Sequence, residues 1–199
     1  MAGVFSVFLV ALVVLAPGAV AYYRYSNASA IQEAFELGRK NNEDTTAFLT
    51  RYSRQYSTPQ KGLYVSSIEF LTPYAQLVND AMLDMANENV YDVQRKYASR
   101  PDMVLVRVRV YSTPTRMLPS ADEDIWREIT IRVSDAKELK SKKKSLNLVY
   151  PGDDAIGFDY ADMELQFDAK DIDSAPITIE VFSLDGQRVE AKFDLAKLK

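Results

Sequence analysis

Two charged stretches hold most of the residues in this chain whose types could do chemistry. Residues 153–173 contain eight acids and one lysine, and residues 137–144 contain five lysines and one glutamate. Clustered carboxylates can bind a hard cation such as Ca²⁺, and clustered lysines can contact anionic lipid headgroups. The weak candidates for a calcium site are Asp153, Asp154 and Asp159. Because their spacing is not the D-x-D-x-D-G order of a calcium loop, we expect solvated charge in both stretches.

Histidine and cysteine are both absent from the 199 residues. Their absence removes the most common general base, the most common metal ligand and every thiolate. A Ser-His-Asp triad or a zinc-thiolate site therefore cannot form within this chain. A carboxylate-pair hydrolase would need two acids about 5–9.5 Å apart in a cleft, and the acidic stretch gives no sign of a cleft. The seven glycines also form no phosphate-binding pattern. We expect no enzymatic activity and no cofactor.

The first 23 residues carry no charged side chain. As a helix rising about 1.5 Å per residue, the apolar run from Val4 to Tyr23 could just cross a hydrocarbon core of about 30 Å. The segment is also typical of a secretory signal peptide, because Pro17-Gly18 precedes a small-x-small pattern at residues 19–21. A cleaved signal peptide and a retained transmembrane anchor both remain open. With either, we expect the rest of the protein to be extracytoplasmic, in the periplasm or outside the cell.

Residues 24–101 are predicted to form a small helical region with one strand, at residues 63–70. Apolar residues recur at helical spacing after Ser29 and again after Asp44. A third helix is expected from residue 73 to residue 97, starting at Pro73 with Thr72 as its cap.

Aromatic residues form a stripe on the second predicted helix. Phe48, Tyr52 and Tyr56 are spaced by four, which places them on one helical face. Such a stripe can bind a partner protein, although it more often packs against a neighbouring helix of the same chain. These three residues are therefore candidates for an interaction site.

Residues 102–199 are predicted to form strands. Valines at 104, 106, 108 and 110 alternate with Leu, Arg and Tyr, which indicates a half-buried strand. Similar runs occur at 125–134, 146–150, 163–167, 177–182 and 188–195, and Asp185-Gly186 marks a hairpin between the last two. Strands without helices between them favour an antiparallel, immunoglobulin-like β-sandwich of six or seven strands. In the 125–134 run, Trp126 should face outward.

The predicted fold class is α+β, in three parts: an apolar signal or anchor helix at 1–23, a helical region at 24–101 and a β-sandwich at 102–199. We expect a non-catalytic, membrane-tethered extracytoplasmic protein, an accessory subunit of a larger membrane or envelope complex. Its partners would be the membrane, through Val4 to Tyr23, and other protein subunits. Nucleic acid is not expected, because the net charge is −4. The alternative is a secreted sandwich that binds sugar or calcium after signal cleavage, with Trp126 and Tyr111 as a stacking platform.

Overall fold

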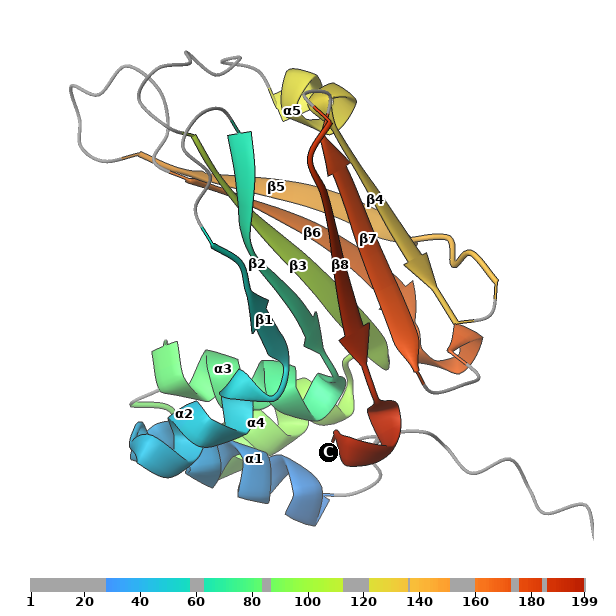
Figure 1. Cartoon of the computed structure of the whole chain (residues 1–199). Coiled ribbons are helices and arrows are strands. Elements are labelled where there is room, and N and C mark those ends of the chain that lie inside the picture. Colours follow the sequence, from blue (N-terminus) through green and yellow to red (C-terminus); the bar gives the residue numbers. More distant parts are fainter. Residues whose placement is uncertain are drawn as a thin grey trace, which may run out of the picture.

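The computed structural model describes residues 28–57, 63–83, 87–112, 122–135, 137–150, 160–172, 176–183 and 186–198. Over these ranges the protein is α+β, with two antiparallel sheets and a group of helices at one end (Figure 1). The apolar N-terminal helix and the calcium candidates Asp153, Asp154 and Asp159 lie outside the described residues. No helix within the described ranges is long and apolar enough to span a membrane.

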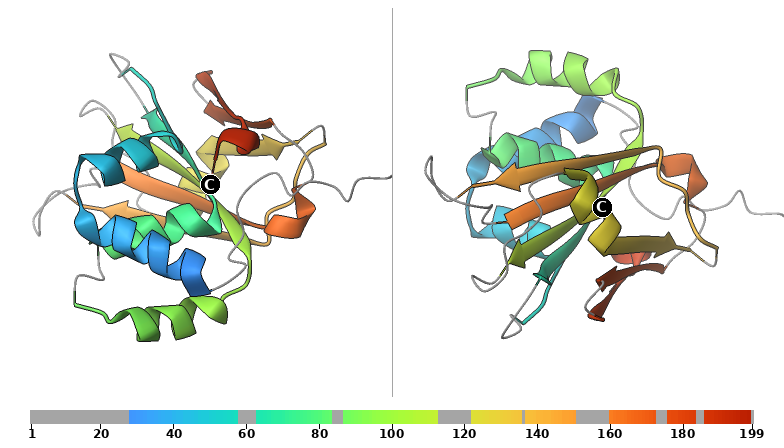
Figure 2. Two further views of the ribbon diagram at one scale, coloured as in Figure 1. Left: turned by 90° about the horizontal axis from the view of Figure 1, so that it is seen from below. Right: turned by 90° about the horizontal axis from the view of Figure 1, so that it is seen from above.

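The larger sheet has five strands in the order β1-β2-β3-β6-β5, and the smaller has three in the order β4-β7-β8. In the larger sheet the strands are β1 (Ser53–Gln55), β2 (Leu63–Leu71), β3 (Met103–Ser112), β6 (Tyr160–Asp168) and β5 (Lys143–Val149). The smaller sheet consists of β4 (Ile129–Ser134), β7 (Ile177–Ser183) and β8 (Arg188–Phe193). Seen along the strands, the smaller sheet lies on one side of the larger sheet and the helices lie on the other (Figure 2).

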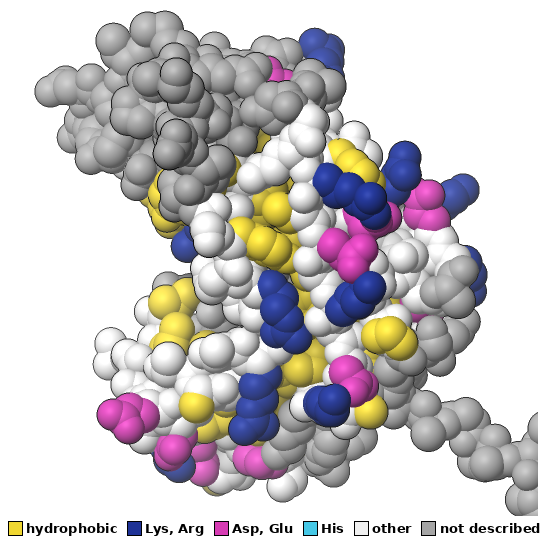
Figure 3. Space-filling view, in the orientation of Figure 1, with side chains coloured by type: hydrophobic (Ala, Val, Ile, Leu, Met, Phe, Trp, Pro, Cys, Tyr) yellow, Lys and Arg dark blue, Asp and Glu magenta, His cyan; other side chains and the backbone are white. Residues whose placement is uncertain are grey.

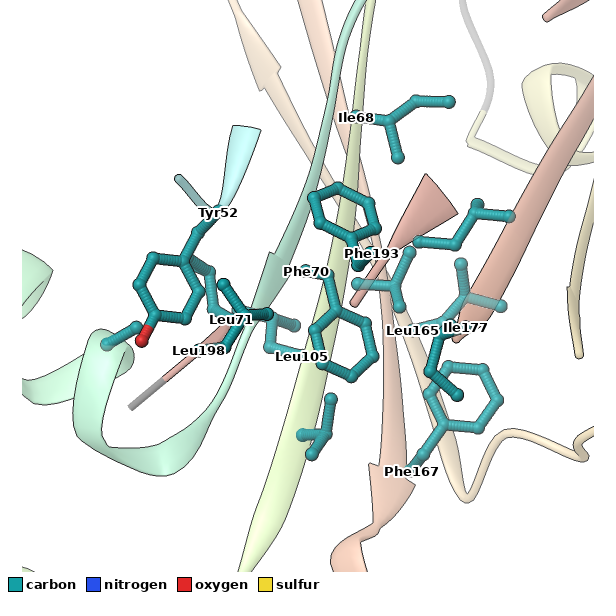
Figure 4. Close-up of a cluster of buried hydrophobic side chains, with 14 of the residues drawn as sticks. Tyr52, Ile68, Phe70, Leu71, Leu105, Leu165, Phe167, Ile177, Phe193 and Leu198 are labelled. Carbon is teal, nitrogen blue, oxygen red and sulfur yellow. The ribbon is translucent and has the colours of Figure 1, made fainter. Parts of the chain in front are cut away.

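The central strand β3 confirms the alternation predicted for it. Its four valines are at most 1% exposed, whereas Arg107 and Arg109 between them are half-buried on the opposite face. The valine face meets the smaller sheet, where Phe70 of β2 and Phe193 of β8 stack with their ring centroids 5.7 Å apart (Figure 4). In β4, Ile129 and Val133 are buried, and Ile131 between them is only partly covered. The core between the sheets is thus built by period-two burial.

The hairpin predicted at Asp185-Gly186 is present, since β7 and β8 pair antiparallel on either side of it. Gly186 has φ +87°, and its N–H donates to the Ser183 carbonyl at 3.1 Å. A side chain at this φ would be strained, so glycine suits the turn.

The helical group consists of α1 (Ala28–Lys40), α2 (Glu43–Thr50), α3 (Pro73–Leu83) and α4 (Val90–Ala98). The prediction of a single helix from residue 73 to residue 97 is wrong, because α3 ends at Leu83 and a separate helix, α4, begins at Val90. Its N-cap Asn89 has extended backbone angles (φ −89°, ψ 153°) and accepts a hydrogen bond from the Asp92 N–H at 3.0 Å. A capping side chain of this kind begins a helix. The start of α3 is as predicted, with the Thr72 hydroxyl accepting from the Ala75 N–H at 3.3 Å.

The strand expected from residue 125 begins four residues later. Residues Asp122–Glu128 form the short helix α5, and β4 starts at Ile129. The two predicted regions also share one sheet, because β2 from the first pairs with β3 from the second along its whole length, with one bulge between Val65 and Ser67. Helical and strand residues accordingly contribute to a single hydrophobic core.

Candidate functional site

The edge strands of the two sheets, β1 and β8, lie side by side and are joined by side chains. Arg54 Nη2 donates to the Lys192 carbonyl at 3.2 Å, and the Tyr56 hydroxyl donates to the Glu190 carbonyl at 2.8 Å. The Val65 N–H completes the set by donating to Gln187 Oε1 at 3.3 Å. We call this contact the β1–β8 seam. It satisfies carbonyls that an edge strand would otherwise expose, and it leaves the two sheets separate.

A pocket of about 550 Å³ opens at one end of the seam, and we call it the seam pocket. It is lined by Arg51, Arg54, Pro176, Lys192, Asp194, Lys197 and Leu198. The lining comes from the C-cap of α2, from β1, from the residue before β7, from β8, and from the C-terminal turn η2 (Leu195–Lys197) with its flanks. It therefore has four cations and one carboxylate, in a chain whose net charge is −4.

Arg54 is the most firmly held cation of the seam pocket. Its Nη1 donates to the Arg51 carbonyl at 3.2 Å and to the Ser53 carbonyl at 2.8 Å, and its Nη2 donates across the seam to Lys192. The guanidinium also lies 4.6 Å from the ring centroid of Phe193. A guanidinium has five N–H donors. Within the described structure these three bonds leave the Nε–H and one Nη2–H of Arg54 for another acceptor.

The two lysines of the seam pocket have local partners, whereas Arg51 has none. Lys197 pairs with Asp194 at 2.9 Å, and Lys192 pairs with Glu190 at 2.8 Å. Both ion pairs are solvent-exposed, so an incoming anion can displace the carboxylate from either lysine at little cost in free energy. The Arg51 side chain is exposed and has no ion pair with any residue that the structure describes.

The seam pocket carries an excess of positive charge. The hydrogen bond from Lys197 holds the pKa of the Asp194 carboxyl below its ordinary value, so Asp194 stays ionised near neutral pH. The other ionisable groups of the lining are two arginines and two lysines. With four cations against one carboxylate, the lining can bind an anion.

The four residues predicted as interaction candidates do not form one surface. Phe48 and Tyr52 are 9% and 1% exposed, and their ring centroids are 5.0 Å apart in the core. The aromatic stripe does not exist as one helical face, because α2 ends at Thr50 and the chain turns into β1. Tyr56 therefore lies at the seam. Trp126 is in α5, partly buried against the core, with Lys144 Nζ 5.4 Å from its ring centroid.

The outer face of the larger sheet carries paired charges. Arg109 of β3 makes two hydrogen bonds with Asp162 of β6, at 2.7 and 2.8 Å. Arg107 bonds to Glu164 at 3.0 Å and to Glu69 at 3.2 Å. Asp162 and Glu164 of β6 are thus paired with arginines, and Asp162 is buried, so the expectation of solvated charge is wrong at these two positions. No group of three or more acids that could hold a metal ion occurs among the described residues.

A row of tyrosines continues this face. Tyr111 lies between Tyr64 and Tyr160, with ring centroids 5.7 and 5.3 Å apart. Each comes from a different strand, because the three positions are aligned in register across β2, β3 and β6. Tyr111 therefore stacks with tyrosines, whereas Trp126 lies under Lys144.

We predict that Glu69 gives stability a measurable pH dependence. Burial raises the pKa of its carboxyl above the ordinary value, against the opposing effect of Arg107. The folded state then holds a proton that the unfolded state has released, so this group's contribution to stability falls as pH rises from the ordinary carboxyl pKa to the folded one. In urea unfolding at a series of pH values, Glu69→Gln should lose this slope. A slope unchanged by Glu69→Gln would assign the dependence to another group.

The lysine-rich stretch, which connects β4 to β5, forms a second basic hollow of about 460 Å³. Residues 137–142 line it together with Lys170 and Asp171, and Lys142 lies 3.9 Å from Asp171. The remaining lysines, Lys143 and Lys144, belong to β5 rather than to a loop.

The seam pocket has no counterpart in the sequence patterns. Its residues come from positions 51–54, 176 and 192–198, which show no run of basic residues and no motif. Only the tertiary contact between β1 and β8 brings them together. No protein-family model, curated protein or solved structure gives a significant match to this chain.

Proposed function

We propose that this chain is a non-catalytic, membrane-tethered extracytoplasmic protein that acts as an accessory subunit of a larger membrane or envelope complex. The observation that carries the proposal is the seam pocket, with four cations and a carboxylate that is already ion-paired. An open surface with an excess of cations suits the binding of an acidic partner.

The tether would keep one end of the protein close to the membrane. Only residues 24–27 separate the apolar run ending at Tyr23 from the start of α1 at Ala28. Four residues span at most about 14 Å, since an extended residue covers about 3.5 Å. The Ala28 carbonyl accepts a hydrogen bond from Gln94 Nε2 of α4 at 3.3 Å. The helical group would therefore face the membrane, with both sheets projecting beyond it.

Alkaline carbonate washing of native membranes, followed by intact-mass measurement, tests the tether. The expected result is an intact chain of 22.5 kDa in the membrane pellet. A native gel in mild detergent should then show a complex larger than the monomer. A shortened chain in the supernatant would contradict the tether, and a detergent-solubilised monomer would contradict the role as a subunit.

The second candidate is an exported sugar-binding sandwich of immunoglobulin-like fold, released by signal cleavage. It is favoured by the half-buried tyrosine row beside the Arg109–Asp162 pair, because aromatic rings next to hydrogen-bonding groups give an amphipathic surface. The two sheets with their shared core support the finer fold assignment. The shortened, freely released chain named above is the result that this candidate predicts.

A further inference from the structure

The seam pocket combines charge with an apolar lining. Pro176 and Leu198 contribute apolar surface between the four cations. Figure 3 shows this side of the molecule, where Lys and Arg side chains lie beside hydrophobic side chains and are interspersed with Asp and Glu. A ligand that matches this lining has several negative charges and also an apolar group.

The four cations of the pocket come from the end of α2, from β1, from β8 and from η2. A pocket of about 550 Å³ has the size that ligands of many atoms occupy. Several cations in a pocket of this size, with apolar residues in the same lining, suit an elongated polyanion better than a lone phosphate group.

Two arginines of the pocket have guanidinium groups that can bind carboxylates. Arg54 is held in place by backbone carbonyls and by the Phe193 ring, and it keeps two N–H donors. Arg51 has no ion-pair partner among the described residues. The planar guanidinium matches the two oxygens of a carboxylate. Preorganisation of Arg54 also lowers the entropic cost of binding.

We infer that the seam pocket binds an acidic peptide segment of a partner protein. Its carboxylates would pair with Arg51, Arg54 and the two lysines, and an apolar side chain between them would contact Pro176 and Leu198. The inference rests on the partner-binding part of the proposed function and identifies the surface and the chemistry through which a partner is held.

Fluorescence polarisation with the full chain in a neutral detergent tests the inference directly. The probe is a labelled pentapeptide of alternating glutamate and leucine. We expect saturable binding that weakens with added salt, because exposed charges are screened. Replacing the glutamates of the probe by glutamine, or its leucines by glycine, should each weaken binding about tenfold. Arg51→Glu should weaken binding of the original probe by a similar factor, and it removes no side-chain hydrogen bond or ion pair among the described residues.

The matched control is Lys40→Glu, the same reversal of charge at an exposed position outside the pocket, at the end of α1. The Lys40→Glu chain should bind the probe with the same affinity as the unchanged chain. Equal binding by Arg51→Glu, or absence of saturable binding, would overturn the inference. So would efficient displacement of the probe by glycerophosphoglycerol, because the pocket would then recognise a lipid headgroup. The assay needs no membrane, so a failure here is distinguishable from a failure of the tether, which carbonate washing reports separately.

Discussion

Replacing Val108 with aspartate is expected to unfold most of the protein. Val108 is fully buried on the central strand β3, where its register partners are Ile68 of β2 and Met163 of β6. Both partners are also fully buried, so an aspartate here would have no water and no cation beside it. A buried charge without a partner costs about 3–5 kcal/mol. Domains of this size have a total stability of about 5–15 kcal/mol.

Thermal unfolding followed by circular dichroism should show this loss as a drop of about 10 °C or more in Tm, or as no cooperative transition at all. The matched control is Thr130→Asp, which introduces the same side chain at an exposed position of β4. Its stability should change by about 0.5 kcal/mol or less. A soluble Val108→Asp variant that melts cooperatively at the unchanged temperature would contradict the burial of β3.

Replacing Gly38 with alanine is expected to destabilise the protein by about 2 kcal/mol, in the range of overpacked sites. Glycine is a poor helix former, so the same change in an exposed helix would stabilise it by about 1 kcal/mol. In α1, however, a Cβ on Gly38 would overlap the Val78 carbonyl oxygen and would lie 2.6 Å from the Ala81 Cβ of α3. Val78 and Ala81 are both buried, so α1 and α3 must move apart.

Urea unfolding of Gly38→Ala, Ala81→Gly and the double variant measures this contact as a coupling energy. Ala81→Gly removes one of the two close approaches, so the double variant should be more stable than the sum of the single changes predicts. The Val78 carbonyl remains, and the rescue should therefore be partial. Additive changes, or a Gly38→Ala chain that is more stable than the original, would contradict the close packing of α1 on α3.

Many of the secondary-structure elements could be predicted because their signals are local. In a strand every second side chain faces the same side, so the four valines of β3 share one face. Because that face is buried, its residues are apolar, and the alternation can be recognised in the sequence. The hairpin at Gly186 could be predicted because glycine adopts the positive φ of the turn without strain. Each inference needed only neighbours within a few residues.

The errors have a common physical cause. Spacing by four placed Phe48, Tyr52 and Tyr56 on one face, but spacing carries no information on where a helix ends. The end at Thr50 is set by the pairing of β1 with β2, which places Tyr52 in the core and Tyr56 at the seam. The division of residues 73–97 into α3 and α4 likewise depends on the cap that Asn89 forms.

The seam pocket belongs wholly to the tertiary structure. Composition alone determined that histidine and thiolate chemistry is absent, because no fold can supply a side chain that the chain lacks. The place at which the four cations gather was decided by the tertiary contact between the two sheets. The lysine-rich and acidic stretches were conspicuous in sequence, yet Arg51, Arg54, Lys192 and Lys197 form the most basic described pocket without being neighbours in the chain. They meet because Arg54 joins β1 to β8, a contact between residues 138 positions apart.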